Sequence, residues 1–197
     1  MACSGRDGAL GHASQRDCRV VMAGSGELDS ALARDVPLEA SLDLRAAFGP
    51  LARGSGDPTI RVAVGAAIRA SVTPEGPGAI EIRVDGAALR ARAWGPGAAW
   101  LLDGLPAALG LDDDDTGFDP SPHPVVARLA RKLGRPRLGR TGAVWEALLP
   151  AMLEQRITGT EAWRNYRRLV KAHGEPAPGP IGLLLPPTPA MVARLPS

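Results

Sequence analysis

The hydrophobic period of this chain changes near residue 95, and that change limits the folds that the chain can adopt. Apolar residues alternate with polar or small ones, as in strands with one buried face, over residues 59–63, 67–73, 79–84 and 88–94. The turn sequences PEGPG (74–78) and DG (85–86) separate the last three of these stretches. We therefore predict an antiparallel meander with one face in solvent.

Helical periodicity replaces the alternation after residue 95. Residues 96–110 begin with a proline and end with a glycine, and they carry an apolar stripe through Trp100, Leu101, Leu105 and Leu109. We expect this helix to cover the buried face of the sheet. A shorter helix is expected after Asp43, which is an N-cap type of residue.

Later segments are helical as well. Residues 124–133 and 142–157 should form two amphipathic helices, the second kinked at its internal proline. Their expected core positions are Val125, Val126, Leu129 and Leu133 in the first helix, and Val144, Leu148, Met152 and Leu153 in the second. Thr158 or Thr160 can cap a third helix that ends at Gly174, and Thr188 can cap a final turn.

These segments divide the chain into four parts. We expect a flexible, glycine-rich leader over residues 1–37, an N-terminal α+β sheet domain over 38–111, an acidic linker over 112–122, and a helical part over 123–197. The predicted fold class is therefore α+β, an antiparallel sheet covered by helices and followed by an all-α part.

Several classes of site are excluded by the residues. Cys3 and Cys18 are too few for a disulfide framework, and no spacing of histidines and cysteines suggests a metal site. No apolar run approaches the roughly 20 residues of a membrane span. Nucleotide-binding and hydrolase motifs are absent, and His12, His123 and His173 do not fit a general base. We expect a cytoplasmic monomer with no cofactor, metal or membrane partner, and no catalytic residue is assigned.

Two basic segments and one polar corner are the candidate binding elements. The first segment contains Arg128, Arg131, Lys132, Arg135, Arg137 and Arg140, and the second contains Arg164, Arg167, Arg168 and Lys171. Each is either a phosphate-binding surface or a solvated helix face. In the second segment Trp163, Tyr166 and Val170 are expected on the packed side. The corner, residues 155–158 (QRIT), joins two predicted helices.

Three segments, taken in order, carry a resemblance to a known family. They are LDLRAAFGPLARGSGDPTIRV (42–62) with the meander and helix that follow it, HPVVARLARKLGRPRLGRTGAVWEALLPAMLEQRITG (123–159), and LLLPPTPAMVARLPS (183–197). Together they resemble the bacterial 3-methyladenine DNA glycosylase II family of the helix-hairpin-helix superfamily. The resemblance implies an N-terminal sheet domain, similar in shape to half of a TATA-binding protein, followed by the first helices of a helix-hairpin-helix glycosylase domain.

The resemblance also implies a function and a set of residues. Such enzymes flip an alkylated base such as 3-methyladenine out of double-stranded DNA and hydrolyse its N-glycosidic bond in base excision repair. Arg156 would fill the gap and Gln155 would probe the opposite base, although many relatives place an apolar residue at the filling position. The implied DNA-binding residues are Gln155, Arg156, Thr158 and Arg140, and the implied base pocket holds Phe48, Pro50 and Trp145.

The chain departs from the family pattern beyond the corner. The family's Pro-Gly-Ile-Gly type of hairpin and the catalytic aspartate that follows it do not occur in the sequence. We therefore expect a truncated member that is inactive alone. The alternatives are a non-catalytic DNA-binding remnant and a truncated protein without function.

Overall fold

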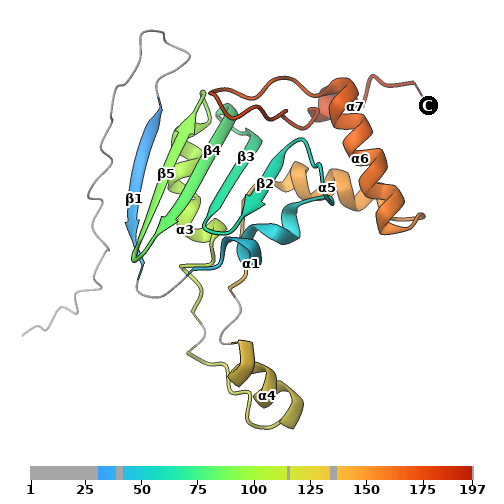
Figure 1. The fold of residues 1–197 in the computed structure, drawn as a ribbon. Helices are drawn as coiled ribbons and strands as arrows, with labels where there is room; N and C mark the ends of the chain where they lie inside the picture. Colours follow the sequence, from blue (N-terminus) through green and yellow to red (C-terminus); the bar gives the residue numbers. More distant parts are fainter. Residues whose placement is uncertain (1–30, 39–41, 115, 134–136, 197) are drawn as a thin grey trace, which may run out of the picture.

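A five-stranded antiparallel sheet forms the centre of the protein (Figure 1). The structure is a computed structural model and describes residues 31–38, 42–114, 116–133 and 137–196. The strands are β1 (Leu32–Pro37), β2 (Ile60–Ala63), β3 (Ala66–Thr73), β4 (Gly76–Asp85) and β5 (Ala88–Trp94), in the spatial order β1-β5-β4-β3-β2. The meander predicted from the alternating residues is confirmed, and its strands end close to the expected positions.

The first strand lies where a leader was expected. β1 pairs with β5 from Leu32↔Ala93 to Pro37↔Ala88. In this register Leu32, Arg34 and Val36 share one face of the sheet, and the arginine between the two apolar residues hides their alternation in the sequence. The Arg34 guanidinium is satisfied there because it donates to the carbonyl of Leu102 at 2.9 Å. The fold therefore begins before Leu38, and residues 1–30 of the expected leader lie outside the described residues.

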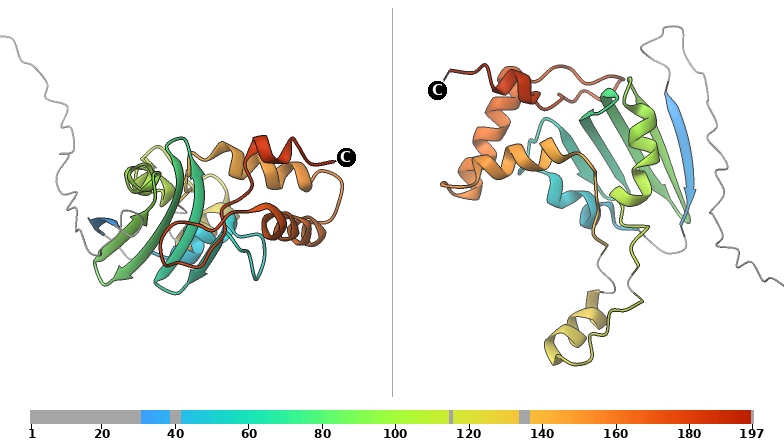
Figure 2. Two further views of the ribbon diagram at one scale, coloured as in Figure 1. Left: turned by 90° about the horizontal axis from the view of Figure 1, so that it is seen from above. Right: turned by 180° about the vertical axis from the view of Figure 1, so that it is seen from behind.

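Short helices cover one face of the sheet (Figures 1 and 2). They are α1 (Leu44–Phe48), the 3-10 turn η1 (Gly49–Leu51), α2 (Ala98–Asp103) and α3 (Leu105–Ala108). The single helix expected over residues 96–110 is divided at Gly104, which ends α2 and begins α3. Asp43 caps α1 as expected, since its carboxylate accepts the Arg45 backbone N–H at 2.8 Å.

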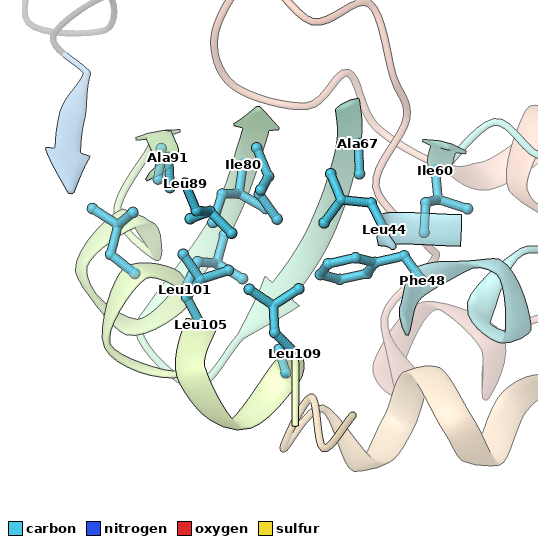
Figure 3. Packing of buried hydrophobic residues seen from close by; sticks show 14 of the residues in the cluster. Leu44, Phe48, Ile60, Ala67, Ile80, Leu89, Ala91, Leu101, Leu105 and Leu109 are labelled. Carbon is cyan, nitrogen blue, oxygen red and sulfur yellow. The ribbon is translucent and has the colours of Figure 1, made fainter. Parts of the chain in front are cut away.

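The main hydrophobic core lies between these helices and the sheet (Figure 3). Ile80, Ile82 and Leu89 of the sheet pack against leucines of α2 and α3 and against Phe48 of α1. All of these side chains are buried, so this layer pair accounts for the α+β part of the prediction.

The opposite face of the sheet is only partly solvated. Ile181, Leu183 and Leu185, in the proline-rich segment after the last long helix, pack on Trp94 and on small residues of β3 and β4. Farther along the strands, Arg83, Arg90 and Arg92 are exposed, as a solvated face requires. The predicted solvated face is therefore confirmed at the end of the sheet that carries these arginines, and it is wrong at the end that the proline-rich segment covers.

The remaining helices are α4 (Pro124–Leu133), α5 (Val144–Leu153), α6 (Gly159–His173) and α7 (Pro189–Val192). α5, α6 and α7 lie beyond the β2 side of the sheet, whereas α4 stands apart from the rest of the molecule (Figures 1 and 2). The two chain segments that lead to and from α4 are bound together. The Arg140 N–H donates to the Ala107 carbonyl at 2.9 Å, and the Leu138 N–H donates to the Asp113 carboxylate at 2.8 Å.

The prediction of which residues of α4 and α5 face inward is wrong. Val125, Val126, Leu129 and Leu133 of α4 are exposed, and so are Val144, Leu148 and Met152 of α5. Only Leu153, among the expected core positions of α5, is partly buried. α5 instead buries Leu149 and Pro150, which lie one turn beyond Glu146, and Glu146 binds the sheet. A polar contact between distant segments therefore decides which side of α5 faces inward.

At the level of architecture, the described residues form a mixed α/β fold with a five-stranded antiparallel sheet. A separate all-α helix-hairpin-helix domain stays a prediction, because α5 and α6 pack on each other and are bound to the sheet layer through Glu146 and Arg167, while α4 stands apart. Within the described residues, no helix has the length and apolarity that crossing a bilayer requires.

Candidate nucleic-acid interface

The polar corner lies at an exposed junction of two helices. α5 ends at Leu153 with Glu154 as its C-cap, and α6 begins after Thr158, whose hydroxyl accepts the Glu161 N–H at 3.4 Å. Of the two predicted caps Thr158 is therefore the one used. Gln155 and Arg156 are exposed, and neither has a hydrogen-bond or ion-pair partner within the described part of the chain. The corner thus presents one amide and one cation to solvent.

A hydrogen bond across the corner joins the two helices. The Trp163 indole N–H of α6 donates to the Glu154 carboxylate of α5 at 3.0 Å. The Trp163 ring is 37% exposed, so this aromatic side chain is less packed than expected, whereas Tyr166 and Val170 are buried as predicted. Gly54 approaches the other side of the ring, because a Cβ built on Gly54 would lie 3.2 Å from Trp163 Cε3. The corner is therefore held from both helices and from a loop of the sheet layer.

Glu146 anchors α5 on the sheet. Its carboxylate lies 2.5 Å from the Arg69 guanidinium of β3, accepts the Val72 N–H at 3.0 Å and also accepts the Ser71 hydroxyl. The Arg69 and Glu146 side chains are only 8% and 13% exposed. Arg69 pairs with Ile60 and Ile80 in the sheet, so its side chain is on the helix-covered face. A buried charge of this kind is tolerated only when it is paired.

A second anchor joins α6 to the loop before β2. Arg167 donates to the Arg53 carbonyl at 2.6 Å. The Asp57 carboxylate accepts the Arg53 N–H at 2.7 Å and both the N–H and hydroxyl of Thr59, at 2.8 and 2.7 Å. Tyr166 packs beside them, and its burial raises its pKa to about 12. Together with Glu146, this network fixes the α5–α6 pair relative to the sheet.

A small cavity of mixed polarity remains between the two anchors. It has a volume of about 60 Å³ and is lined by polar groups that include Arg53, Thr59, Glu146 and Tyr166. The Arg53 Nε is buried without a protein partner. A cavity of this size can hold water molecules, which are partners for a buried donor of this kind.

The basic residues expected to bind phosphate fall into separate groups. Arg164, Arg168 and Lys171 are exposed and recur every three or four residues, so they share one side of α6. Arg167 is instead used in the anchor to Arg53. The α4 residues Arg128, Arg131 and Lys132 are exposed on the helix that stands apart, and Arg135 lies outside the described residues. Arg137 donates to the Gly110 carbonyl at 3.1 Å.

Arg140 does not lie beside the corner. It precedes α5 and lines an open groove of about 370 Å³ with Trp100, Asp103 and Gly142, whereas the corner follows α5. The ten residues of α5 separate the two by about 15 Å along the helix axis. The structure therefore brings Gln155, Arg156 and Thr158 together and leaves Arg140 apart from them.

The residues of the expected base pocket are also separate. Phe48 is 2% exposed inside the main core, so it cannot line an open pocket. Pro50 is exposed in η1, and the Trp145 indole donates to the Pro187 carbonyl at 2.8 Å. Two contacts that hold the site together were not predicted from the sequence. Glu146 and Arg69 are distant along the chain, and Trp163 and Glu154 lie on different helices.

Comparisons with known proteins give a likeness in fold. No family model and no curated protein matches the chain. Among solved structures, it is similar to a 3-methyladenine DNA glycosylase from Archaeoglobus fulgidus, with a TM-score of 0.62 and 16% sequence identity. The likeness covers 81% of this chain and 57% of that protein, so the chain spans a little over half of its length. At this identity the comparison shows a shared glycosylase-like fold.

Proposed function

We propose that this chain recognises damaged duplex DNA as the lesion-probing part of a DNA glycosylase that acts on alkylated bases such as 3-methyladenine. The observation that carries the proposal is the exposed Gln155-Arg156 corner, anchored to a sheet layer of a glycosylase-like fold. The reaction would hydrolyse the bond between the base and the sugar and so begin base excision repair.

The geometry of the corner suits the proposed role. A base that leaves the duplex leaves an unstacked gap, and a side chain that enters from the minor groove can hold the gap open. Arg156 would fill this gap while Gln155 contacts the opposite base. Arg164, Arg168 and Lys171 continue from the corner along α6, where they would neutralise backbone phosphates. Because the corner is held before DNA arrives, little conformational freedom is lost on binding.

No described residue is assigned the catalytic charge-stabilising role. Glu146 is bound to Arg69, Glu154 accepts the Trp163 indole, and Glu161 is exposed at the start of α6. None of these carboxylates is free in a cavity that could hold a base. We therefore expect the 197-residue chain to bind duplex DNA without releasing 3-methyladenine. This makes a DNA-binding module the second candidate function.

Replacing Arg156 with alanine tests the proposal. We expect the affinity for a short duplex with an unpaired or abasic position to fall about tenfold, the scale of losing one specific arginine contact. The affinity of the unsubstituted chain should fall steeply with salt, because phosphate contacts release counterions. Fluorescence anisotropy at several salt concentrations measures both quantities.

Arg83→Ala is the matched control for this experiment. Arg83 is an exposed arginine of β4 that is bound to Glu81, away from the corner. This variant should bind as the unsubstituted chain does. If the unsubstituted chain melts cooperatively but does not bind duplex DNA at low salt, the proposed function is wrong. A chain that does not melt cooperatively would instead favour the non-functional alternative.

Two substitutions of Glu154 distinguish how the position of the corner and how its charge affect DNA binding. Glu154→Gln and Glu154→Ala remove the same negative charge next to Arg156, but only glutamine keeps an oxygen that can accept the Trp163 indole N–H. We expect the alanine variant to bind duplex DNA about threefold to tenfold more weakly than the glutamine variant, on the scale of one hydrogen bond. Equal affinities in the same anisotropy assay would show that the Trp163–Glu154 contact does not position the corner.

A further inference from the structure

The loop between η1 and β2 presents unpaired backbone N–H groups. Gly54 and Gly56 have left-handed backbone conformations, with φ of +78° and +80°. The N–H groups of Gly54, Ser55 and Gly56 donate to no acceptor in the described part of the chain, and the Ser55 hydroxyl has no partner there either. Successive free N–H groups in turns with left-handed residues form concave anion-binding sites.

This loop lines a groove whose charged groups favour an anion. The groove has a volume of about 510 Å³ and is also lined by Arg45 of α1 and Arg61 of β2. Arg45 makes no ion pair within the described residues, and Arg61 has only the Gly182 carbonyl as a partner, at 2.9 Å. Arg45 is therefore the unpaired cation among the lining residues, because the Arg61 side chain lies on the other face of β2 from Ile60 and Val62, where it binds Gly182.

The one acidic residue among the lining residues has its carboxylate oxygens occupied inside the loop. Asp57 is 4% exposed, and its two carboxylate oxygens accept three hydrogen bonds from the backbone of Arg53 and from Thr59. Its carboxylate is thus used inside the loop, where it helps to hold the chain in the observed turn. The groove keeps the free N–H groups and Arg45 as its ligand-binding groups.

We propose that this groove binds a phosphate group, presented either by a nucleic-acid backbone or by a small phosphate ester. Backbone N–H groups and guanidinium groups are the donors that bind phosphate best, and here the loop N–H groups and Arg45 line one concave surface. Nothing in the proposal requires a base or a sugar to enter the groove. The recognised chemistry is the charged phosphate oxygen alone.

The groove adjoins the polar corner through a short chain of contacts. A Cβ built on Gly54 would lie 2.8 Å from Arg167 Nη1 and 3.2 Å from Trp163, so the loop packs directly on α6. Trp163 in turn binds Glu154 at the corner. A duplex held at the corner would therefore bring a backbone phosphate close to this loop. The choice of a DNA backbone as the phosphate source rests on the proposed function, whereas the phosphate site itself does not.

Titrations with inorganic phosphate and with a short duplex test the groove. We expect either probe to shift the backbone amide NMR signals of Gly54, Ser55 and Gly56 in the full chain. We expect Arg45→Ala to weaken duplex binding threefold to tenfold and to lower the salt slope by about one, as for a lost phosphate contact. Arg90→Ala, an exposed sheet arginine that does not line the groove, is the control.

The outcomes separate this inference from the proposed function. Amide shifts with duplex, together with weaker binding of Arg45→Ala, support a backbone phosphate in the groove. Shifts with inorganic phosphate but no duplex binding support the phosphate site with a small ester as its ligand, and they contradict the proposed function. If the duplex binds and Arg156→Ala weakens its binding, while the loop amides do not shift and Arg45→Ala binds as Arg90→Ala does, the groove proposal alone is wrong.

Discussion

Replacing Glu146 with alanine should lower the free energy of unfolding by about 3–5 kcal/mol, the largest effect that we expect from a single substitution in this chain. The variant leaves the Arg69 guanidinium, 8% exposed, without its carboxylate, and it also removes the acceptor of the Ser71 hydroxyl and the Val72 N–H. A buried charge without a partner is far more costly than the pair is stabilising. Urea denaturation followed by circular dichroism measures the change.

Two further variants show whether the lost pairing is the cause. Replacing both partners, Arg69→Met with Glu146→Leu, removes the charges together and should recover most of the stability. Glu75→Ala, at an exposed turn position, should change the free energy of unfolding by less than about 0.5 kcal/mol. If the double variant is as unstable as Glu146→Ala, the loss comes from packing or from the Ser71 and Val72 donors, which lose their acceptor in both variants, rather than from the unpaired arginine.

The second large effect concerns pH. Tyr166 is the only tyrosine in the sequence and is 5% exposed, and burial raises its pKa to about 12 from its ordinary value of 10.0. The unfolded chain therefore loses this proton at lower pH than the folded chain does. The contribution of Tyr166 to stability is fully present below pH 10 and is lost as the pH rises from about 10 to about 12. Two pKa units correspond to roughly 2–3 kcal/mol.

A single tyrosine makes this prediction directly measurable. Tyrosinate absorbance should appear near pH 12 in the folded chain and near pH 10 in the chain unfolded by denaturant. In Tyr166→Phe the free energy of unfolding should fall less steeply over the same range of pH. Tyrosinate formation near pH 10 under native conditions would show that the side chain is not buried between α6 and the loop before β2.

The sheet was predictable from the sequence because each of its four later strands repeats a local pattern. Turn residues at 74–78 and 85–86 separate three of these strands, and both the pattern and the turns act over a few residues. β1 was missed because Arg34 occupies an inward position and finds its acceptor, the Leu102 carbonyl, on a distant helix. The helix caps at Asp43, Thr158 and Thr188 were predictable for the same local reason as the turns.

Local patterns could not predict which side of α5 is buried, nor the contacts that hold α5 and α6 on the sheet layer. Glu146 and Arg69 are 77 residues apart, and Arg167 and Arg53 are 114 residues apart, so no local pattern reports either contact. The corner itself was predictable because a helix cap follows a helix end. Its expected neighbours are elsewhere: Arg140 lies at the other end of α5, and Phe48 lies in the core. The groove at residues 54–56 depends on which N–H groups stay unpaired, a property that only the folded chain has.

The segment that carries α4 leaves the rest of the fold and returns to it at almost the same point. The Arg140 N–H donates to the Ala107 carbonyl, and the Leu138 N–H donates to the Asp113 carboxylate. In topological terms, the part of the chain between these contacts is an insertion, and the sheet, α5 and α6 form a closed body without it. Differences in length or sequence within the insertion would therefore leave the geometry of the corner and the groove unchanged, and α4 is free to diverge independently of both.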